Sequence, residues 1–377
     1  MNHSHELRRI CSEAQNFHRP KYRTCRKYSF RLGLVAAWLL GGGWCFAQDA
    51  AQDTAIIDTI RTQTQIGESD QRRIGDWVEA QVTRLKGTPE EQRGPAAIKM
   101  RELFRAQFEN PSNSPAFEEQ FASKTASVAA SQLGTTALDP MSARALSKIF
   151  LDFNRPEPIP AFLAGLKSKD AGVRMLAASG LAAQRAAIAA DKTRLDQMVT
   201  SLREVGVSEP EGVVLDRIYW ALSVPPAQAA SVLDTFMTIF EKRLENRRGG
   251  ALASDGAEIS AYEFFRTPGI VAALSPPQKE QLVRTLATFL RFDAQRYTTP
   301  NLNFIEIDRL QRLLDGAEEI IVALVGSVKG GDIRGSLAAG HTPEQVLQQA
   351  SLWVGDAKSN QQGGLNAAPW NVPVGAP

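Results

Sequence analysis

The sequence predicts an all-α protein, built either as an α-solenoid of helical repeats or as a multi-helix array. Apolar residues recur at spacings of three and four along most of the chain, which places them on one face of a helix. Capping sequences in which proline follows a serine or threonine, and Glu or Gln stands third after that serine or threonine, precede several of these stretches, beginning at Thr88, Ser275 and Thr342. The alternating patterns and hairpin turn pairs that indicate β-strands are lacking. Helix therefore follows helix.

Residues 1–47 differ in composition from the rest of the chain. A basic stretch is followed by an apolar run from Leu32 to Ala47, in which Cys45 and Ala47 place small residues at the last and third-last positions. This pattern predicts a secretion signal cleaved between Ala47 and Gln48. The run has 16 residues, fewer than the about 20 that a helix needs to cross a bilayer. An uncleaved single-pass anchor is the alternative.

Removal of this segment would change the chemistry of the chain. All three cysteines lie within residues 1–47, so neither disulfides nor thiolate chemistry would remain. His341 would be the last histidine, which argues against a transition-metal site. The formal net charge would change from +2 to −4, which gives no support to a nucleic-acid-binding surface. We therefore predict no cofactor, no metal and no nucleic-acid partner.

Residues 48–153 form the first predicted helical region. The apolar spacing places helices at 54–87 with a break at Gly67, at 88–110, at 114–133 and at 139–153. In the second of these helices, we predict that Thr88 is the N-cap and Pro89 the first helical residue. Pro95 is a second point at which this helix could begin, because proline lacks the amide that a helix interior requires.

The most specific pattern lies at residues 158–188, within a region that we assign to 154–248. A short apolar helix is followed by a polar turn and by a second helix that opens at Asp170. One face of that helix is formed by small or medium-sized side chains, namely Val173, Ala177, Gly180, Leu181 and Gln184. This face should pack tightly against Phe162, Leu163 and Leu166. Such a pair leaves apolar surface uncovered, so further pairs should stack on either side of it.

The second helix of this pair resembles a helix of a known repeat family. The run Asp170, Val173, Arg174, Ala177, Gly180 and Leu181 resembles the second helix of a HEAT or armadillo-like repeat. In physical terms, Asp170 can cap the helix and can pair with Arg174 four residues on. A shift of 41 residues places Val214, Ile218, Ala221 and Leu222 at the matching positions, as in a second repeat. The resemblance implies an α-solenoid.

Further helices are expected through the rest of the chain. After a helix at 190–205, Ser208 to Glu211 repeats the capping pattern. Lys242, Arg243, Arg247 and Arg248 form a basic cluster that we interpret as a solvated helix end. Residues 249–256 form the best internal linker and 257–355 the C-terminal helical region. Within it, 326–335 is a glycine-rich connection expected to be flexible, and the tail 356–377 is expected to be disordered.

Several residues could carry chemistry, and each also has a structural interpretation. Lys329 lies in a glycine-rich stretch without the spacing of a phosphate-binding loop. The carboxylate pairs Glu118/Glu119, Glu306/Asp308 and Glu318/Glu319 are interpreted as solvated helix faces. Trp77, Trp220 and Trp353 lie on apolar stripes and are predicted core residues, whereas Trp370 suggests a docking peptide in the tail. We assign no catalytic, cofactor-binding or metal-binding residue.

The leading hypothesis is an exported, non-enzymatic helical-repeat scaffold that binds a protein partner in the periplasm or cell envelope of a bacterium, or outside it. One alternative is an all-α toroid that acts on polysaccharide through two carboxylates, with tryptophan and tyrosine as sugar platforms. The other is a membrane-tethered structural protein, which differs only in keeping residues 1–47.

Overall fold

A computed structural model describes residues 54–134, 138–153, 155–248, 255–326, 328–357 and 359–374. Within these ranges the chain is helical and contains no β-strand, with an isolated bridge between Asp356 and Gln361. The prediction of an all-α protein is confirmed. The predicted cleavage point between Ala47 and Gln48 lies outside the described residues, as does most of the predicted linker 249–256.

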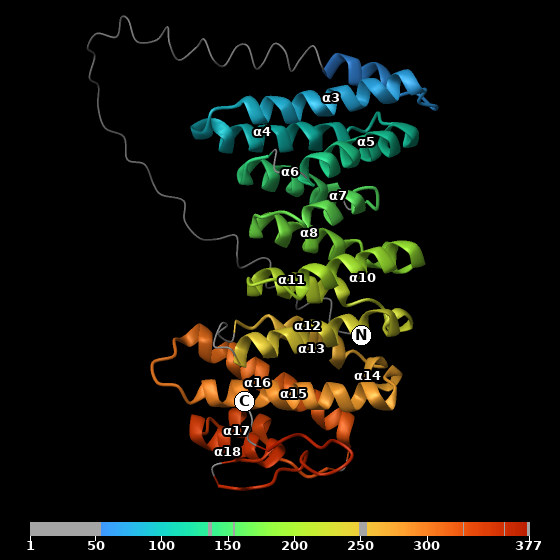
Figure 1. The fold of residues 1–377 in the computed structure, drawn as a ribbon. Helices are drawn as coiled ribbons and strands as arrows, with labels where there is room; N and C mark the ends of the chain where they lie inside the picture. The colour runs from blue at the N-terminus through green and yellow to red at the C-terminus, as the bar shows by residue number, and fades with distance from the viewer. Residues whose placement is uncertain are drawn as a thin grey trace, which may run out of the picture. The chain divides into compact units, whose positions relative to one another are not determined.

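The helices follow one another with short connections (Figure 1). A helix at 54–60 precedes the numbered elements. These are α3 (Glu68–Gly87), α4 (Glu90–Phe108), α5 (Pro115–Leu133), α6 (Pro140–Phe153), α7 (Ile159–Gly165), α8 (Ala171–Ala183), α9 (Arg185–Ala189), α10 (Lys192–Gly206), α11 (Gly212–Leu222), a 3₁₀ turn (Pro226–Gln228), α12 (Ala230–Arg248), α13 (Glu258–Arg266), α14 (Ile270–Ala273), α15 (Pro276–Tyr297), α16 (Phe304–Val325), α17 (Ile333–Ala338) and α18 (Pro343–Val354).

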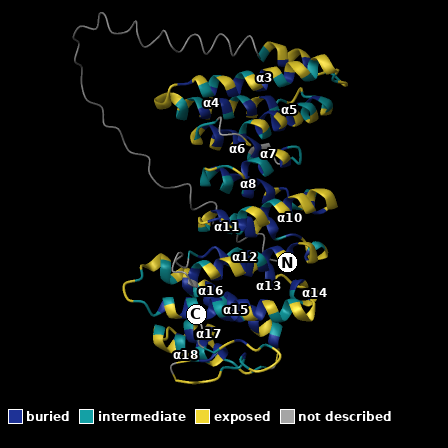
Figure 2. Ribbon diagram, viewed as in Figure 1, coloured by how far each residue is buried: buried dark blue, intermediate teal, exposed yellow. Residues whose placement is uncertain are grey.

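Contacts between helices fall into two series. In what we call the first series, each helix packs on the next in the order α4, α6, α8, α11, α13, α16. The second series contains α3, α5 and α7, and then α10, α12, α15 and α18, again with each helix packed on the next within these two runs. Buried apolar side chains form one continuous cluster from Ile57 to Val372, so that buried positions occur along the whole succession of helices (Figure 2).

The pairing of α7 with α8 shows why the sequence places small residues on α8. A Cβ atom added to Gly180 would lie 2.3 Å from the ring of Phe162, so only glycine allows the two helices to approach this closely. Gly165 of α7 similarly lies against Ala177 of α8. The predicted close packing of these helices is confirmed. The residues placed at matching positions 41 further along, from Val214 to Leu222, are buried against α8 on α11.

Two predicted helix starts are wrong. Thr88 ends α3 instead of capping α4, because its hydroxyl donates to the carbonyl of Arg84. Pro89 is the N-cap of α4, and no side chain caps this helix. The helix then runs without interruption through Pro95, whose missing amide leaves the carbonyl of the exposed Glu91 to solvent. By contrast, Ser275 and Thr342 form the predicted capping boxes of α15 and α18.

The predicted disorder of the tail is wrong for residues 359–374. Leu365 and Val372 are buried against the helices. The guanidinium of Arg291 in α15 donates at 2.8 Å to the carbonyls of both Val354 and Pro373. The composition of the tail suggested disorder, but buried apolar side chains and hydrogen bonds from Arg291 hold it on its own chain.

The glycine-rich connection before α17 is also more ordered than predicted. A Cβ atom on Gly330 would lie 2.1 Å from the indole of Trp353, and one on Gly331 would lie 2.0 Å from the carbonyl oxygen of Gln349. Both glycines are therefore held against α18, and Lys329 belongs to this packed connection. None of the helices in the described part of the chain combines the length and the apolar character needed to span a membrane.

Candidate interaction surface

Three junctions between successive helices of the first series carry equivalent ion pairs. Arg93 of α4 approaches Asp139, which precedes α6, to 3.7 Å. Arg144 of α6 pairs with Asp170 before α8, and Arg174 of α8 pairs with Glu209 before α11, both at 2.6 Å. We call these three pairs the arginine ladder. Each one joins an arginine in one helix to a carboxylate near the start of the next.

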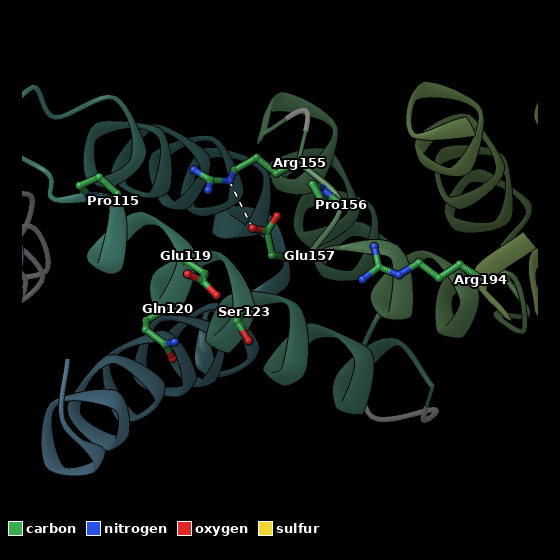
Figure 3. Close-up of a pocket in the computed structure, with 8 residues that line it drawn as sticks. All are labelled: Pro115, Glu119, Gln120, Ser123, Arg155, Pro156, Glu157 and Arg194. Atoms are coloured by element: carbon green, nitrogen blue, oxygen red, sulfur yellow. Dashed lines mark ion pairs between the residues drawn. The ribbon is translucent and has the colours of Figure 1, made fainter. Parts of the chain in front are cut away.

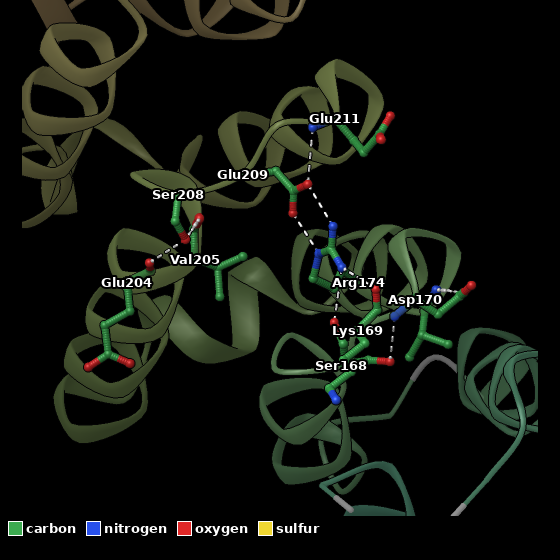
Figure 4. Close-up of polar contacts among 10 residues, drawn as sticks. Ser168, Lys169, Asp170, Arg174, Glu204, Val205, Ser208, Glu209 and Glu211 are labelled. Atoms are coloured by element: carbon green, nitrogen blue, oxygen red, sulfur yellow. Dashed lines mark hydrogen bonds and ion pairs between the residues drawn. The ribbon is translucent and has the colours of Figure 1, made fainter. Parts of the chain in front are cut away.

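The predicted ion pair between Asp170 and Arg174 is replaced by two rungs of this ladder, and Figure 4 shows the rung between Arg174 and Glu209. Asp170 caps α8 as predicted, accepting a hydrogen bond from the amide of Val173 at 2.9 Å. The same carboxylate accepts two hydrogen bonds from Arg144. Arg174 instead donates hydrogen bonds to both carboxylate oxygens of Glu209, from Nε at 2.6 Å and from Nη2 at 2.8 Å. A bidentate pair between helices is stronger than a single contact along one helix surface.

These contacts shift the protonation equilibria of the ladder. The hydrogen bonds from Arg144 lower the pKa of Asp170, and the hydrogen bond to Glu209 raises the pKa of Arg174. Burial raises the pKa of Asp139, but hydrogen bonds from Ser142 and the charge of Arg93 outweigh burial, so its pKa is lowered. These shifts favour the charged forms of Asp139, Asp170 and Arg174.

Glu209 had a different predicted role. We expected it to belong to the capping pattern of α11, but no side chain caps that helix. The carboxylate is buried beneath Arg174 and also accepts a hydrogen bond from the amide of Glu211. The spacing of 35 residues between Arg174 and Glu209 gives no local signal, so only the packing of α8 on α11 identifies the pair.

Most of the large apolar side chains that the described residues expose lie on the first series. They are Ile98 on α4, Met141 on α6, Val213 and Trp220 on α11, and Phe304, Ile305 and Val322 on α16. The exposed fraction of Phe304 is 82% and that of Val213 is 54%. Burial of such side chains in an interface is the main favourable contribution to most protein association. The first series therefore offers the stronger candidate surface for a partner.

The tryptophans divide between core and surface. Trp77 and Trp353 are buried, as predicted. Trp220 is 37% exposed, so its predicted place in the core is wrong; its ring lies between the guanidinium groups of Arg185 and Arg217. Trp370 packs partly against the core of the same chain, and its carbonyl accepts a hydrogen bond from Arg284. The tail that carries Trp370 thus docks on its own helices.

A polar groove of about 450 Å³ lies at the N-terminal ends of α5 and α10 (Figure 3). Its lining residues are Pro115, Glu119, Gln120, Ser123, Arg155, Pro156, Glu157 and Arg194. Arg155 pairs with Glu118 of α5 at 2.8 Å and with Glu157 of its own connection at 3.4 Å. Small-molecule sites are mostly apolar, so this mixed-charge lining suits a polar chain segment better than a cofactor.

The predicted solvated helix end at α12 is instead a buried ionic cluster. Arg243 and Arg247 both contact Glu258 of α13, each at 3.0 Å, and Arg247 contacts Asp293 of α15 at 3.1 Å. We call these four residues the buried ionic cluster. The helices α13 and α15 fold back over the end of α12 and exclude water from it. Lys242 does remain exposed, as predicted, whereas the side chain of Arg248 lies outside the described residues.

The buried carboxylates are engaged in structural contacts. Burial raises the pKa of Glu258, but the charges of Arg247 and Arg243 outweigh burial, so its pKa is lowered. Glu318, predicted to lie on a solvated face, is buried and accepts hydrogen bonds from the amides of Ile333 and Arg334 and from the indole of Trp353. A general acid needs a raised pKa and access to substrate. Neither carboxylate meets both conditions.

Metal-binding chemistry also lacks a candidate in the described residues, where no group of three or more histidine, cysteine, aspartate or glutamate side chains could hold an ion. His341 is exposed, and its Nδ1 lies 2.9 Å from the hydroxyl of Ser336. Comparisons of the chain with models of protein families, with curated proteins and with solved structures found no significant match.

Proposed function

We propose that this chain is an exported, non-catalytic scaffold of the HEAT or armadillo-like kind that binds a protein partner in the periplasm or cell envelope of a bacterium. The observation that carries the proposal is the succession of packed helices in the first series, which exposes apolar side chains on α4, α6, α11 and α16. Stacked helical repeats use such extended surfaces to bind other proteins.

The arginine ladder supports the repeat interpretation. Its three pairs join successive helices in the same sense, from an arginine to a carboxylate at the start of the next helix. A repeat protein gains stability from equivalent contacts between neighbouring units. The alternation of the two helix series supports the same interpretation, because every second helix meets an equivalent neighbour.

The exposed side chains support the binding interpretation. Tryptophan and arginine are enriched among residues that dominate binding energy in protein interfaces, and Trp220 is exposed between two arginines. The polysaccharide-active alternative would need two free carboxylates facing one cleft. Glu258 and Asp293 are both bound to Arg247, and the partly exposed Asp315 and Glu319 are both bound to Arg266, so neither pair is free. We therefore retain the scaffold as the proposed function.

Site-specific photo-crosslinking tests partner binding. A photoreactive amino acid is placed at Ile98, Val213 or Ile305 on the first series, and at the exposed Ile56 outside both series as the matched control. Irradiation of intact cells that produce each variant should give one discrete crosslinked species from the first three positions and none from Ile56. Absence of a crosslinked species at all three positions would contradict the scaffold proposal.

Mass spectrometry of the exported protein tests its localisation. An N-terminus at Gln48 is the expected result and means release by signal peptidase. A chain that keeps the apolar run from Leu32 to Ala47 would instead favour the tethered structural protein. This result is independent of the crosslinking, because it concerns only how the scaffold is held in the envelope.

A further inference from the structure

The exposed indole of Trp220 is held by arginines from two elements. The Cζ atom of Arg185, at the start of α9, lies 5.5 Å from the ring centroid, and that of Arg217 on α11 lies 5.2 Å from it. Both distances are within the about 6 Å over which a cation is attracted to an aromatic ring. The two contacts restrain the ring in an exposed position before any partner arrives, which reduces the entropy lost on binding.

The two arginines beside Trp220 differ in their carboxylate partners. The Nε atom of Arg217 lies 3.5 Å from Asp216, whose other carboxylate oxygen accepts a hydrogen bond from Ser260. Arg185 donates to the carbonyl of Ala182, and no carboxylate of the described residues lies within ion-pair distance of its guanidinium. Asp216 is thus the carboxylate of the described residues within ion-pair distance of either guanidinium group, and Arg185 retains donors for a ligand anion.

An apolar side chain extends the surface along α11. Val213 lies seven residues before Trp220, with Arg217 between them on the same helix face. Seven residues of helix span about 10 Å. An extended peptide covers that distance in about three residues. We call Val213, Arg217, Trp220 and Arg185 the Trp220 patch.

We propose that the Trp220 patch binds an extended acidic segment of a protein partner. An apolar side chain of the segment lies on the indole of Trp220, an adjacent carboxylate pairs with Arg185, and a second apolar side chain three residues away covers Val213. Charge complementarity selects an acidic segment, because a basic one would meet two guanidinium groups. The inference rests on the proposed scaffold function and names the chemistry of its partner.

Fluorescence anisotropy with a synthetic probe tests the inference on the full exported protein. The probe is the fluorescein-labelled peptide Gly-Asp-Leu-Asp-Gly-Val-Gly, and the control peptides carry Asn or Lys in place of both Asp residues. The Asp peptide should bind about tenfold more tightly than the Asn peptide, since charge-assisted hydrogen bonds are lost in the latter. Equal binding of the two, or tighter binding of the Lys peptide, would overturn the inference.

Variants locate the binding. Trp220→Ala should weaken binding of the Asp peptide by about tenfold or more, and Arg185→Gln should abolish the preference for Asp over Asn. Arg72→Gln removes an exposed arginine of α3 and should change neither. If circular dichroism shows that Trp220→Ala does not fold, the result for Arg185→Gln tests the inference instead. The side chain of Arg185 makes one hydrogen bond, to the carbonyl of Ala182, besides its contact with Trp220.

The two proposals fail in different ways. If the photoreactive residue at Val213 captures a partner while Arg185→Gln leaves the Asp preference intact, the acidic segment is wrong and the scaffold function stands. If no position of the first series gives a crosslinked species, the scaffold function fails whatever the peptide does.

Discussion

Arginine–carboxylate pairs occur in two regions of this molecule that differ in their access to water. In the arginine ladder, the side chain of Arg144 is 51% exposed where it meets Asp170. In the buried ionic cluster, Arg247 and Glu258 are 3% and 0% exposed. The same chemical groups therefore have different energetic roles. A solvated pair contributes little, whereas a buried charge that loses its partner destabilises the fold strongly.

The arginine ladder and the buried ionic cluster also differ in how they join helices. The ladder repeats at three successive junctions, and each rung joins two neighbouring helices. The cluster instead ties three helices, α12, α13 and α15, at one place in the chain. Repeated contacts between neighbouring helices suit a succession of similar units, whereas a single buried cluster fixes one particular arrangement.

The largest expected effect is that of Glu258→Gln. The substitution weakens two buried hydrogen bonds, from Arg243 and Arg247, each worth about 1.5–3 kcal/mol. The free energy of unfolding should therefore fall by about 3–5 kcal/mol, although the arginines keep Asp255 and Asp293 as partners. Urea denaturation followed by circular dichroism measures this loss. Asp196→Asn, which breaks the exposed pair with Lys192, is the control and should change stability by less than about 1 kcal/mol. Similar losses in both variants would remove the distinction between the two regions.

A second substitution separates packing from ion pairing within α8. Gly180→Ala forces a methyl group against the ring of Phe162, and overpacking of this kind should cost about 2–3 kcal/mol. Gly75→Ala is the matched control, because a Cβ atom there meets no other atom within 4 Å. This control should stabilise the protein by up to about 1 kcal/mol, since alanine is the better helix former. Loss of stability in the Gly75 variant would contradict this account.

How far the sequence anticipated these features depends on the distance over which a residue acts. The small-residue stripe of α8 and the capping boxes at Ser275 and Thr342 act within a few residues, so periodicity and capping rules identified them. The partner of Arg174 lies 35 residues away. The partners of Arg247 lie on two other helices. Such contacts exist only once the helices pack.

Local sequence patterns also failed to predict that Trp220 is exposed and that the tail is ordered. A helical stripe tells which face of α11 carries apolar residues but not where the neighbouring helix ends, and Trp220 lies at the exposed margin of that face. The tail has the composition of a disordered segment. It is nevertheless held by Arg291, a residue that no local pattern connects with it. Candidate binding residues were therefore not predictable from the chain alone.

Within the ladder, Glu209→Gln should have the largest effect of any rung. Glu209 is buried, so the loss of its charge weakens two hydrogen bonds from Arg174 and should cost about 1.5 kcal/mol. A double-mutant cycle with Arg174→Gln measures the coupling directly by urea denaturation. A coupling energy near zero would mean that the rung has no energetic role.

Acid should weaken the ladder in a defined direction. Because Arg144 lowers the pKa of Asp170 in the folded state, the contribution of Asp170 is fully present above the unfolded value of about 3.9 and is lost as the pH falls through the lowered folded value. Asp170→Asn retains a capping side chain but no longer titrates. The urea midpoint of this variant should therefore fall less steeply below about pH 4 than that of the unmodified protein. A parallel decline of both would exclude Asp170 as a source of acid sensitivity.

Arg144→Gln should have the smallest effect and gives the most direct test of the solvated rung. Its guanidinium is half exposed, so the pair with Asp170 should contribute about 0.2–1 kcal/mol. Salt at about 1 M screens exposed charges beyond about 3 Å, so the stability difference between the variant and the unmodified protein should shrink at that concentration. The difference between Glu258→Gln and the unmodified protein should persist in salt, because screening does not reach a buried pair. Equal salt dependence of the two variants would show that both regions experience the same solvent, and the comparison would then fail.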